Sequence, residues 1–456
     1  MIEPATTPDP RRWWVLVAVG IGTFMSALDG SIINTVLPLL RAELDTTVAG
    51  IEWVATIYLL VVSGLLLGFG RAGDIYGQKR VYLLGFVVFM IGSALSGRAP
   101  SAPALVALRV VQAIGAAMLF SSSPAILTKS FPGSERGRAL GIQGTMTYLG
   151  LTVGPSLGGW IAHTIGWRWV FYINVPVGII AAALAWRMVP DDRPSGPHER
   201  FDIPGAVLFI AGLSALMVAL NQGHDWGWTA APTLGLTALA LVLLAAFIRV
   251  ERRTPSPMLD LSLFRNRIFA ASATSAFLNY LCVYSVTFVI PFLLIQGRGL
   301  DTQHAGVILT AQPLVMAIVA PISGTLSDRL GTRGPAILGM AILALGLLFL
   351  AWTTAHAPLT TIAAALAVVG LGVGIFVSPN NSALMGAAPR ERQGIAAGVL
   401  ATARNAGMVC GIGLAGAIFT TSLAAGTADS LVHGVQASLL TAAGIAVMGA
   451  VTSWLR

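Results

Sequence analysis

Two ionisable side chains interrupt apolar stretches of the sequence. Asp29 is the one carboxylate between Trp13 and Leu40, and Arg109 lies in the apolar stretch 103–128. A stretch of this length can cross a bilayer as a helix, because the hydrocarbon core needs about 20 apolar residues. An ionisable group inside such a helix is costly, and it usually faces a cavity where it handles a proton, an ion or a substrate.

A carboxylate in this setting can trade its proton for a cation. We predict that Asp29 alternates between its protonated and charged forms, and that Arg109 or a cationic substrate competes with the proton for it. With the N-terminus inside, Asp29 lies about 16 Å and Arg109 about 9 Å from the outer ends of their helices, at about 1.5 Å per residue. The simpler alternative is a static ion pair that holds two helices together.

Glu52 is a second candidate carboxylate. It stands beside Trp53 near the outer start of the apolar stretch 50–70. A role in admitting protons and a plain position at the membrane interface both fit this placement.

A glycine stripe marks the apolar stretch 139–165. Gly150, Gly154 and Gly158 recur every four residues and share one helix face, which lets two backbones approach closely. Pro155 removes one backbone donor and permits a bend. Tight packing and a part in conformational gating are both compatible with this pattern.

Polar and aromatic residues within the apolar stretches are candidates to contact a substrate. A greasy cavity with several aromatic rings and one acid would suit lipophilic cations. Each of these side chains can equally serve helix packing, and Arg404 in the stretch 394–424 has no evident partner. The candidate cavity residues are Asn34, Tyr58, Gln112, Gln143, Tyr148, Tyr280, Tyr284 and Asn380.

The composition indicates a membrane protein and excludes several other classes. Hydrophobic residues make up 55% and charged residues only 10% of the 456 residues, whereas soluble domains have about 25% charged residues. The two cysteines and six histidines show no metal-ligand or disulfide spacing. There is no phosphate-binding loop for ATP and no nucleophile–base–acid arrangement, so we expect neither an enzyme nor a metal or other cofactor.

The apolar stretches predict fourteen transmembrane helices. Their approximate limits are 13–40, 50–70, 81–97, 103–128, 139–165, 169–189, 204–222, 231–249, 269–296, 304–327, 335–354, 358–386, 394–424 and 432–454. With the N-terminus inside, 21 of the 27 Lys and Arg residues fall in inner segments and four in outer loops. This bias predicts cytoplasmic termini, and it explains the net charge of +8 without a nucleic-acid partner.

An internal repeat divides the chain. Residues 70–80 read GRAGDIYGQKR, and residues 324–333 read GTLSDRLGTR. Both follow the second stretch of a group of six, if the two stretches near 204–249 are set aside. Repeated halves are common in secondary transporters, whose substrate site lies between the halves. The predicted units are therefore an N-terminal six-helix bundle (1–190), a linker with two additional helices (191–265) and a C-terminal six-helix bundle (266–456).

Five motifs together resemble the major facilitator superfamily, specifically its fourteen-span drug:proton antiporter branch. They are LDGSIINTVLP (28–38), the loop 70–80, LRVVQAIG (108–115), GLTVGPSLGG (150–159) and GWRWVFYINVPVG (166–178). The resemblance covers essentially the whole chain. The loop departs from the family pattern at Ile75 and Gln78, where basic residues are usual, and Ala113 replaces a glycine.

The resemblance implies an all-α fold of two six-helix bundles with two extra helices, and residue roles within it. It implies that Arg109 takes part in proton coupling and that the glycine motif with Pro155 serves antiport. It also implies that Asp74 lies near the start of the helix that begins at Gly394, where the helix dipole favours an anion. Asp328 would be its counterpart, and both would stabilise one state of an alternating-access cycle; an exposed turn aspartate is the simpler alternative.

The expected function is export of small hydrophobic or cationic compounds in exchange for protons, as in multidrug efflux. An exporter of a specific lipid, metabolite or amino acid is the alternative within the class, and a sensor, a channel or a membrane enzyme is the alternative outside it. Small-molecule substrate, protons and lipid are the expected partners. We expect a monomer in the inner (plasma) membrane of a bacterium.

Overall fold

The structure, a computed structural model, is entirely helical where it is described. It describes residues 11–46, 48–192, 201–227, 229–300, 302–353, 357–423 and 430–456. The side chains of Asn34 and Glu52 lie outside the described ones, so their predicted roles stay predictions.

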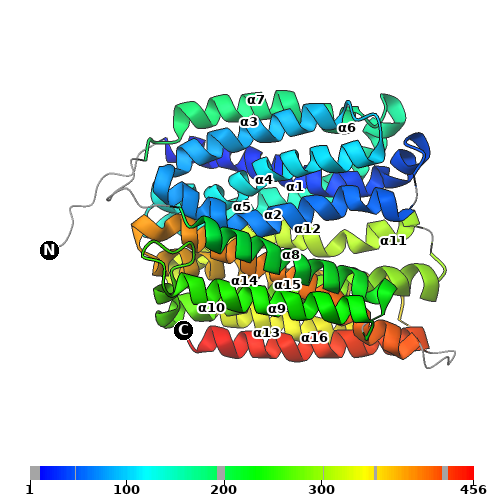
Figure 1. The fold of residues 1–456 in the computed structure, drawn as a ribbon. Helices are drawn as coiled ribbons and strands as arrows, with labels where there is room; N and C mark the ends of the chain where they lie inside the picture. The colour runs from blue at the N-terminus through cyan, green and yellow to red at the C-terminus, as the bar shows by residue number, and fades with distance from the viewer. Residues whose placement is uncertain are drawn as a thin grey trace.

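The long helices run side by side, and the start of α1 and the end of α16 lie at the same end of the bundle (Figure 1). We call this end the termini side. The first half of the chain contains α1 (Arg12–Glu43), α2 (Val48–Tyr76), α3 (Gln78–Ser96), α4 (Ala102–Ser130), α5 (Arg136–Thr164), α6 (Trp169–Tyr172) and α7 (Asn174–Met188). Two helices follow, α8 (Ile203–Trp226) and α9 (Ala231–Glu251). The second half contains α10 (Arg267–Phe292), α11 (Thr302–Leu309), α12 (Ala311–Leu330), α13 (Arg333–Thr353), α14 (Leu359–Ala387), α15 (Gln393–Leu423) and α16 (Ser430–Trp454).

Within the described residues, 13 helices are long and apolar enough to cross a membrane. The 13 do not include α5, a glycine-rich helix whose 29 residues equal the length of α4. The stretch expected at 169–189 is divided into α6 and α7, and the stretch expected at 304–327 is divided at Thr310 into α11 and α12. Apolar composition cannot predict these local breaks, because the residues on both sides of each break are apolar.

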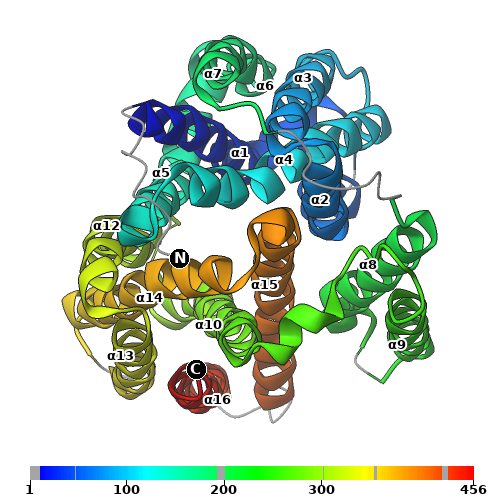
Figure 2. The ribbon, with the colours of Figure 1, turned by 90° about the vertical axis from the view of Figure 1, so that its left-hand side faces the viewer.

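Viewed along the helices, α1–α7 form one group and α10–α16 another, with α8 and α9 to one side (Figure 2). The two groups meet at two seams, where α2 packs against α15 and α5 packs against α12. Helix α8 contacts both α2 and α15, so α8 covers the first seam, and α9 packs against α8.

Both seams use glycines for close approach at the termini side. A Cβ on Gly394 would overlap the carbonyl oxygen of Gly70, and a Cβ on Gly324 would overlap that of Gly137. The two crossings are therefore built alike, and each joins a helix of the first half to a helix of the second half. This arrangement matches the repeat seen at 70–80 and 324–333.

Candidate functional site

Asp29 and Arg109 form a buried ion pair inside the first half of the chain. A terminal nitrogen of Arg109 on α4 (Nη1) lies 2.6 Å from Oδ2 of Asp29 on α1. The side chains are 0% and 1% exposed, respectively. Interhelical pairing is the expected solution for two charges held in apolar surroundings.

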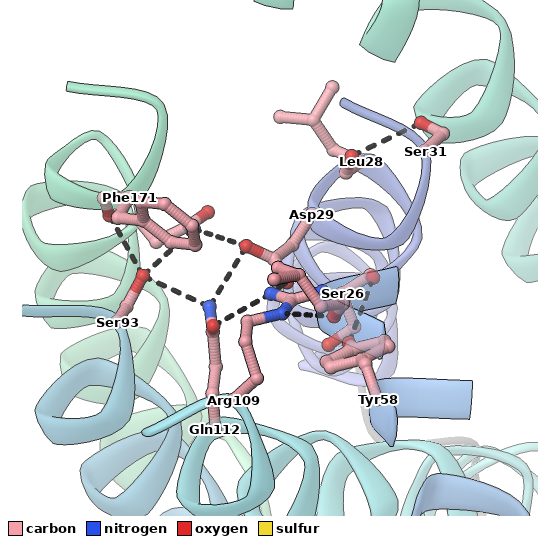
Figure 3. Close-up of polar contacts among 11 residues, drawn as sticks. Ser26, Leu28, Asp29, Ser31, Tyr58, Ser93, Arg109, Gln112 and Phe171 are labelled. Carbon is pink, nitrogen blue, oxygen red and sulfur yellow. Dashed lines mark hydrogen bonds and ion pairs between the residues drawn. The ribbon is translucent and has the colours of Figure 1, made fainter. Parts of the chain in front are cut away.

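Three further polar side chains complete the environment of the carboxylate (Figure 3). The amides of Gln112 and Asn174 donate to Oδ1 of Asp29 at 2.8 and 2.9 Å. Both amides also donate to the Ser93 hydroxyl at 3.0 Å, and that hydroxyl donates to the Phe171 carbonyl at 2.8 Å. We call Asp29, Arg109, Gln112, Asn174 and Ser93 the acid cluster. It joins α1, α3, α4 and α7 through one carboxylate.

The guanidinium of Arg109 makes further contacts on its other side. It lies 4.2 Å above the ring of Tyr58, its Nε donates to the Val54 carbonyl at 3.3 Å, and its Nη1 also donates to Gln112. Its second terminal nitrogen, Nη2, is buried and has no hydrogen-bond partner among the described residues. A buried donor left unpaired costs free energy, so the cluster is not fully satisfied in this conformation.

The prediction that Asp29 faces a water-filled cavity is wrong for this conformation. The side chain points into the interior of the first group of helices and is 1% exposed. Sequence reasoning placed the acid on α1 but had no signal for which face of α1 it occupies. Direct competition between a proton and a substrate at this carboxylate therefore has no support from the geometry.

Asp74 and Asp328 cap helices of the opposite half. Asp74 accepts from the backbone N–H groups of Gly394 and Ile395 at 2.7 and 2.9 Å, at the start of α15. Asp328 accepts from Gly137 and Arg138 at 2.8 and 3.0 Å, at the start of α5. The expected position of Asp74 beside Gly394 is thus found, and an exposed turn aspartate is not the arrangement at either site. The role of both in gating stays a prediction.

The glycine stripe of α5 packs against α1. A Cβ on Gly150 would lie 2.7 Å from the Phe24 carbonyl oxygen, and a Cβ on Gly158 would lie 2.5 Å from the Ile32 side chain. Gly154 faces Ser31, whose hydroxyl donates to the Gly150 carbonyl at 3.1 Å. The stripe therefore allows α5 to pack closely on α1. The part of α1 that it contacts includes the residues on either side of Asp29 in the sequence. Pro155 is exposed on the other face of α5.

A central cavity lies between the two halves. It measures about 590 Å³, counted with the space open to solvent. Three of the predicted substrate-contact residues line it, namely Gln143, Tyr148 and Tyr280. Arg404 also lines it, which gives this arginine the location that sequence reasoning could not assign.

The other predicted cavity residues lie elsewhere. Tyr284 lines a separate, largely apolar cavity of about 790 Å³ between α2, α8 and α15. Tyr58 and Gln112 belong to the surroundings of Asp29 and are 2% and 0% exposed. Asn380 donates to the Ser272 carbonyl at 3.1 Å and accepts from Arg456, so its side chain anchors the end of the chain and lines neither cavity.

The sequence was compared with models of known protein families. The family model described as Major Facilitator Superfamily matches residues 19–412 and 272–456. The chain belongs to the major facilitator superfamily. The expected family is confirmed at this level, whereas its drug:proton antiporter branch stays a prediction.

Relatives within the superfamily are transporters by name. The chain is 36% identical to the riboflavin transporter RibZ of Clostridioides difficile over 413 residues, 91% of this chain and 89% of that protein. It is 33% identical to the multidrug resistance protein Stp of Mycobacterium tuberculosis over 411 residues, 90% of this chain and 76% of that protein. Among solved structures, the human organic anion transporter MFSD10 superposes with a TM-score of 0.70 at 15% identity, over 98% of this chain and 100% of that one.

Sequence reasoning missed two members of the acid cluster. Asn174 stood within the motif at 166–178, yet nothing in that motif indicated contact with Asp29. Ser93 lies in α3 with no distinguishing neighbours. Both are polar residues inside apolar helices, and that property alone could have nominated them.

Proposed function

We propose that this member of the superfamily is a proton-coupled exporter of small, largely apolar compounds that works by alternating access. The observation that carries the proposal is the buried pair of Asp29 and Arg109, whose carboxylate also accepts from the amides of Gln112 on α4 and Asn174 on α7. A lone acid–base pair inside a transporter half is a natural place to bind and release one proton.

Protonation of Asp29 would remove the charge that holds Arg109. The Gln112 and Asn174 amides would also lose a strong acceptor, because hydrogen bonds to ionised groups are the stronger ones. Breaking one partner of a buried ion pair typically costs about 3–5 kcal/mol, which is enough to shift the balance between two packings of these helices. Proton binding would thereby act on the arrangement of α1, α4 and α7, and through α1 on its contact with α5.

Coupling to the substrate would then be indirect. The stripe at Gly150 and Gly158 joins α1 to α5, and α5 lines the central cavity through Gln143 and Tyr148. A shift of α1 relative to α5 would reach the cavity without any contact between Asp29 and cargo. This path replaces the direct exchange of proton and cation expected from the sequence.

The contacts of Asp74 and Asp328 close the termini side of both seams. We take this side as cytoplasmic, because the distribution of Lys and Arg favours an orientation with both termini inside. The proposal also takes the protein to be a monomer in the inner membrane. On that orientation the structure corresponds to a state closed to the cytoplasm. Helix α5 would count as the fourteenth span, since it lies in the bundle with the others and is as long as α4.

A second candidate is transport of one planar metabolite. The relative named as a riboflavin transporter, at 36% identity over 91% of this chain, favours it, while the relative named as a multidrug resistance protein favours broad export. Both candidates use the same cavity and differ only in how strictly it selects. Competition among unrelated compounds for transport separates them.

Transport in sealed vesicles with an imposed pH gradient tests the proposal. Purified wild-type protein should drive uptake of substrate into inverted vesicles that are acidic inside, and Asp29→Asn should reduce this flux to the level of empty vesicles. Asp45→Asn is the matched control, because Asp45 is an exposed aspartate in the loop after α1. Full proton-driven flux by the Asp29→Asn protein would remove Asp29 from the coupling mechanism.

A further inference from the structure

We propose that the central cavity selects aromatic organic anions, and that Arg404 holds their negative group. This inference rests on the proposed transport function and names its substrate class. It reverses the preference for lipophilic cations that the sequence suggested, because the charge that lines the cavity is positive.

Arg404 is half-buried, and part of its guanidinium makes no hydrogen bond to the described residues. Its Nε lies 3.5 Å from the Oδ1 of Asn405, and its guanidinium carbon lies 5.4 Å from the centre of the Phe120 ring. Its two terminal nitrogens have no hydrogen-bond partner among the described residues. An arginine inside a membrane protein is retained at a cost and usually marks a path for substrate or ions.

No acidic side chain balances this charge among the described residues that line the cavity. The carboxylates that could have done so are engaged elsewhere: Asp29 is paired with Arg109, and Asp74 and Asp328 cap helices at the termini side. A cation entering the cavity would meet an uncompensated positive charge in surroundings of low polarity. An anion would instead supply the partner that Arg404 lacks, and a carboxylate matches the planar fork of a guanidinium.

The rest of the lining favours a flat, aromatic ligand. Phe120, Tyr148 and Tyr280 present rings from three different helices, α4, α5 and α10. The hydroxyl of Tyr148 is buried and has no hydrogen-bond partner within the described part of the chain. The amides of Gln143 and Asn381 add neutral donors and acceptors. Rings with a few well-placed polar groups are typical of sites for planar small molecules.

A direct binding experiment with three matched probes tests the charge preference. The probes are naphthalene-2-carboxylate, naphthalene-2-carboxamide and (naphthalen-2-ylmethyl)trimethylammonium, which share one ring system and differ in charge. Binding to the full-length protein in lipid nanodiscs, measured by equilibrium dialysis without a pH gradient, should be at least tenfold tighter for the carboxylate than for the ammonium probe.

Substitution of Arg404 should move this ratio in a defined way. Arg404→Lys should keep the preference for the anion, Arg404→Gln should abolish it, and Arg404→Glu should reverse it in favour of the cation. Loss of folding cannot produce a reversal. Arg41→Gln, at an exposed arginine near the outer end of α1, should leave the ratio unchanged.

Three results of the binding assay would overturn the inference: tighter binding of the cation by the wild type, no binding of any probe, or an unchanged ratio in Arg404→Glu. Because the assay uses no proton gradient, its outcome is independent of proton coupling. Anion binding without proton-driven flux would defeat the proposed function alone. Proton-driven flux of cations that is insensitive to Arg404 would defeat this inference alone.

Discussion

Asp74 and Asp328 occupy equivalent positions at the two seams of the molecule, each four residues after a glycine that touches the opposite helix. Each carboxylate accepts two backbone N–H groups at the first turn of a helix from the other half of the chain. The free N–H groups and the positive end of the helix dipole both favour an anion there. Two pairs of hydrogen bonds thus hold the halves together at the termini side.

Removal of either carboxylate should favour opening of that side. Loss of a helix cap costs about 1 kcal/mol, which is about fivefold in the ratio of two conformations. Asp74→Ala and Asp328→Ala should each increase the population with longer distances between spin labels at the exposed positions Ser134 and Gly334. Pulsed electron spin resonance measures these distances directly.

Asp192→Ala is the control for this prediction. Asp192 caps α3 in the same way, accepting from the N–H groups of Gln78 and Lys79 at 2.8 and 3.2 Å, but it follows closely after α7 and does not join α3 to the second half. Its loss should lower stability without lengthening the distance between the halves. An equal lengthening in all three variants would show that the caps stabilise helices and do not latch the halves.

Replacing a glycine at either crossing by a larger residue should destabilise the protein. A Cβ on Gly394 would overlap the Gly70 carbonyl, so Gly394→Ala should force α2 and α15 apart and cost about 1–3 kcal/mol. Thermal unfolding in detergent should show the loss as a lower melting temperature. Gly444→Ala on α16 is the matched control, because a Cβ there meets nothing within 4 Å. The control should be neutral or more stable by up to about 1 kcal/mol, as expected for alanine in a helix; a fall equal to that of Gly394→Ala would argue against the crossing as the cause.

The sequence predicted the helices well and the direction of their side chains poorly. Apolar length determines which segments can cross a bilayer, so the helix positions followed from composition with errors of a few residues. The repeat at 70–80 and 324–333, with the family resemblance, led to the contact of Asp74 with Gly394. The face of α1 that carries Asp29 did not follow, because in a helix apolar on every side no amphipathic pattern shows which face meets protein and which meets lipid.

Arg404 illustrates the same limit from the opposite direction. Its position in the middle of an apolar helix indicated importance, yet its surroundings come from α4, α5, α10 and α14, which are distant in sequence.

Gln78, which departs from the family pattern, is a second residue whose contact did not follow from the sequence. Its amide donates to Asp74 at 3.1 Å, so it supports the carboxylate as a neutral donor where a basic residue is usual.

The acid cluster should behave as one energetic unit. Asp29→Asn leaves Arg109 charged without its partner, and Arg109→Gln leaves the carboxylate unpaired, so each change should cost about 3–5 kcal/mol of stability. The double variant should be less destabilised than the sum of the two by about 1–3 kcal/mol, because the second change removes the charge that the first left alone. Chemical unfolding in detergent, analysed as a double-mutant cycle, measures this coupling.

The pair of Glu43 and Arg168 provides the comparison, since its charged atoms are 3.8 Å apart and about half of each side chain is exposed. Its coupling should stay within about 1 kcal/mol. Additive losses at Asp29 and Arg109 would mean that the two side chains contribute separately, and a mechanism that works by breaking their bond would lose its basis.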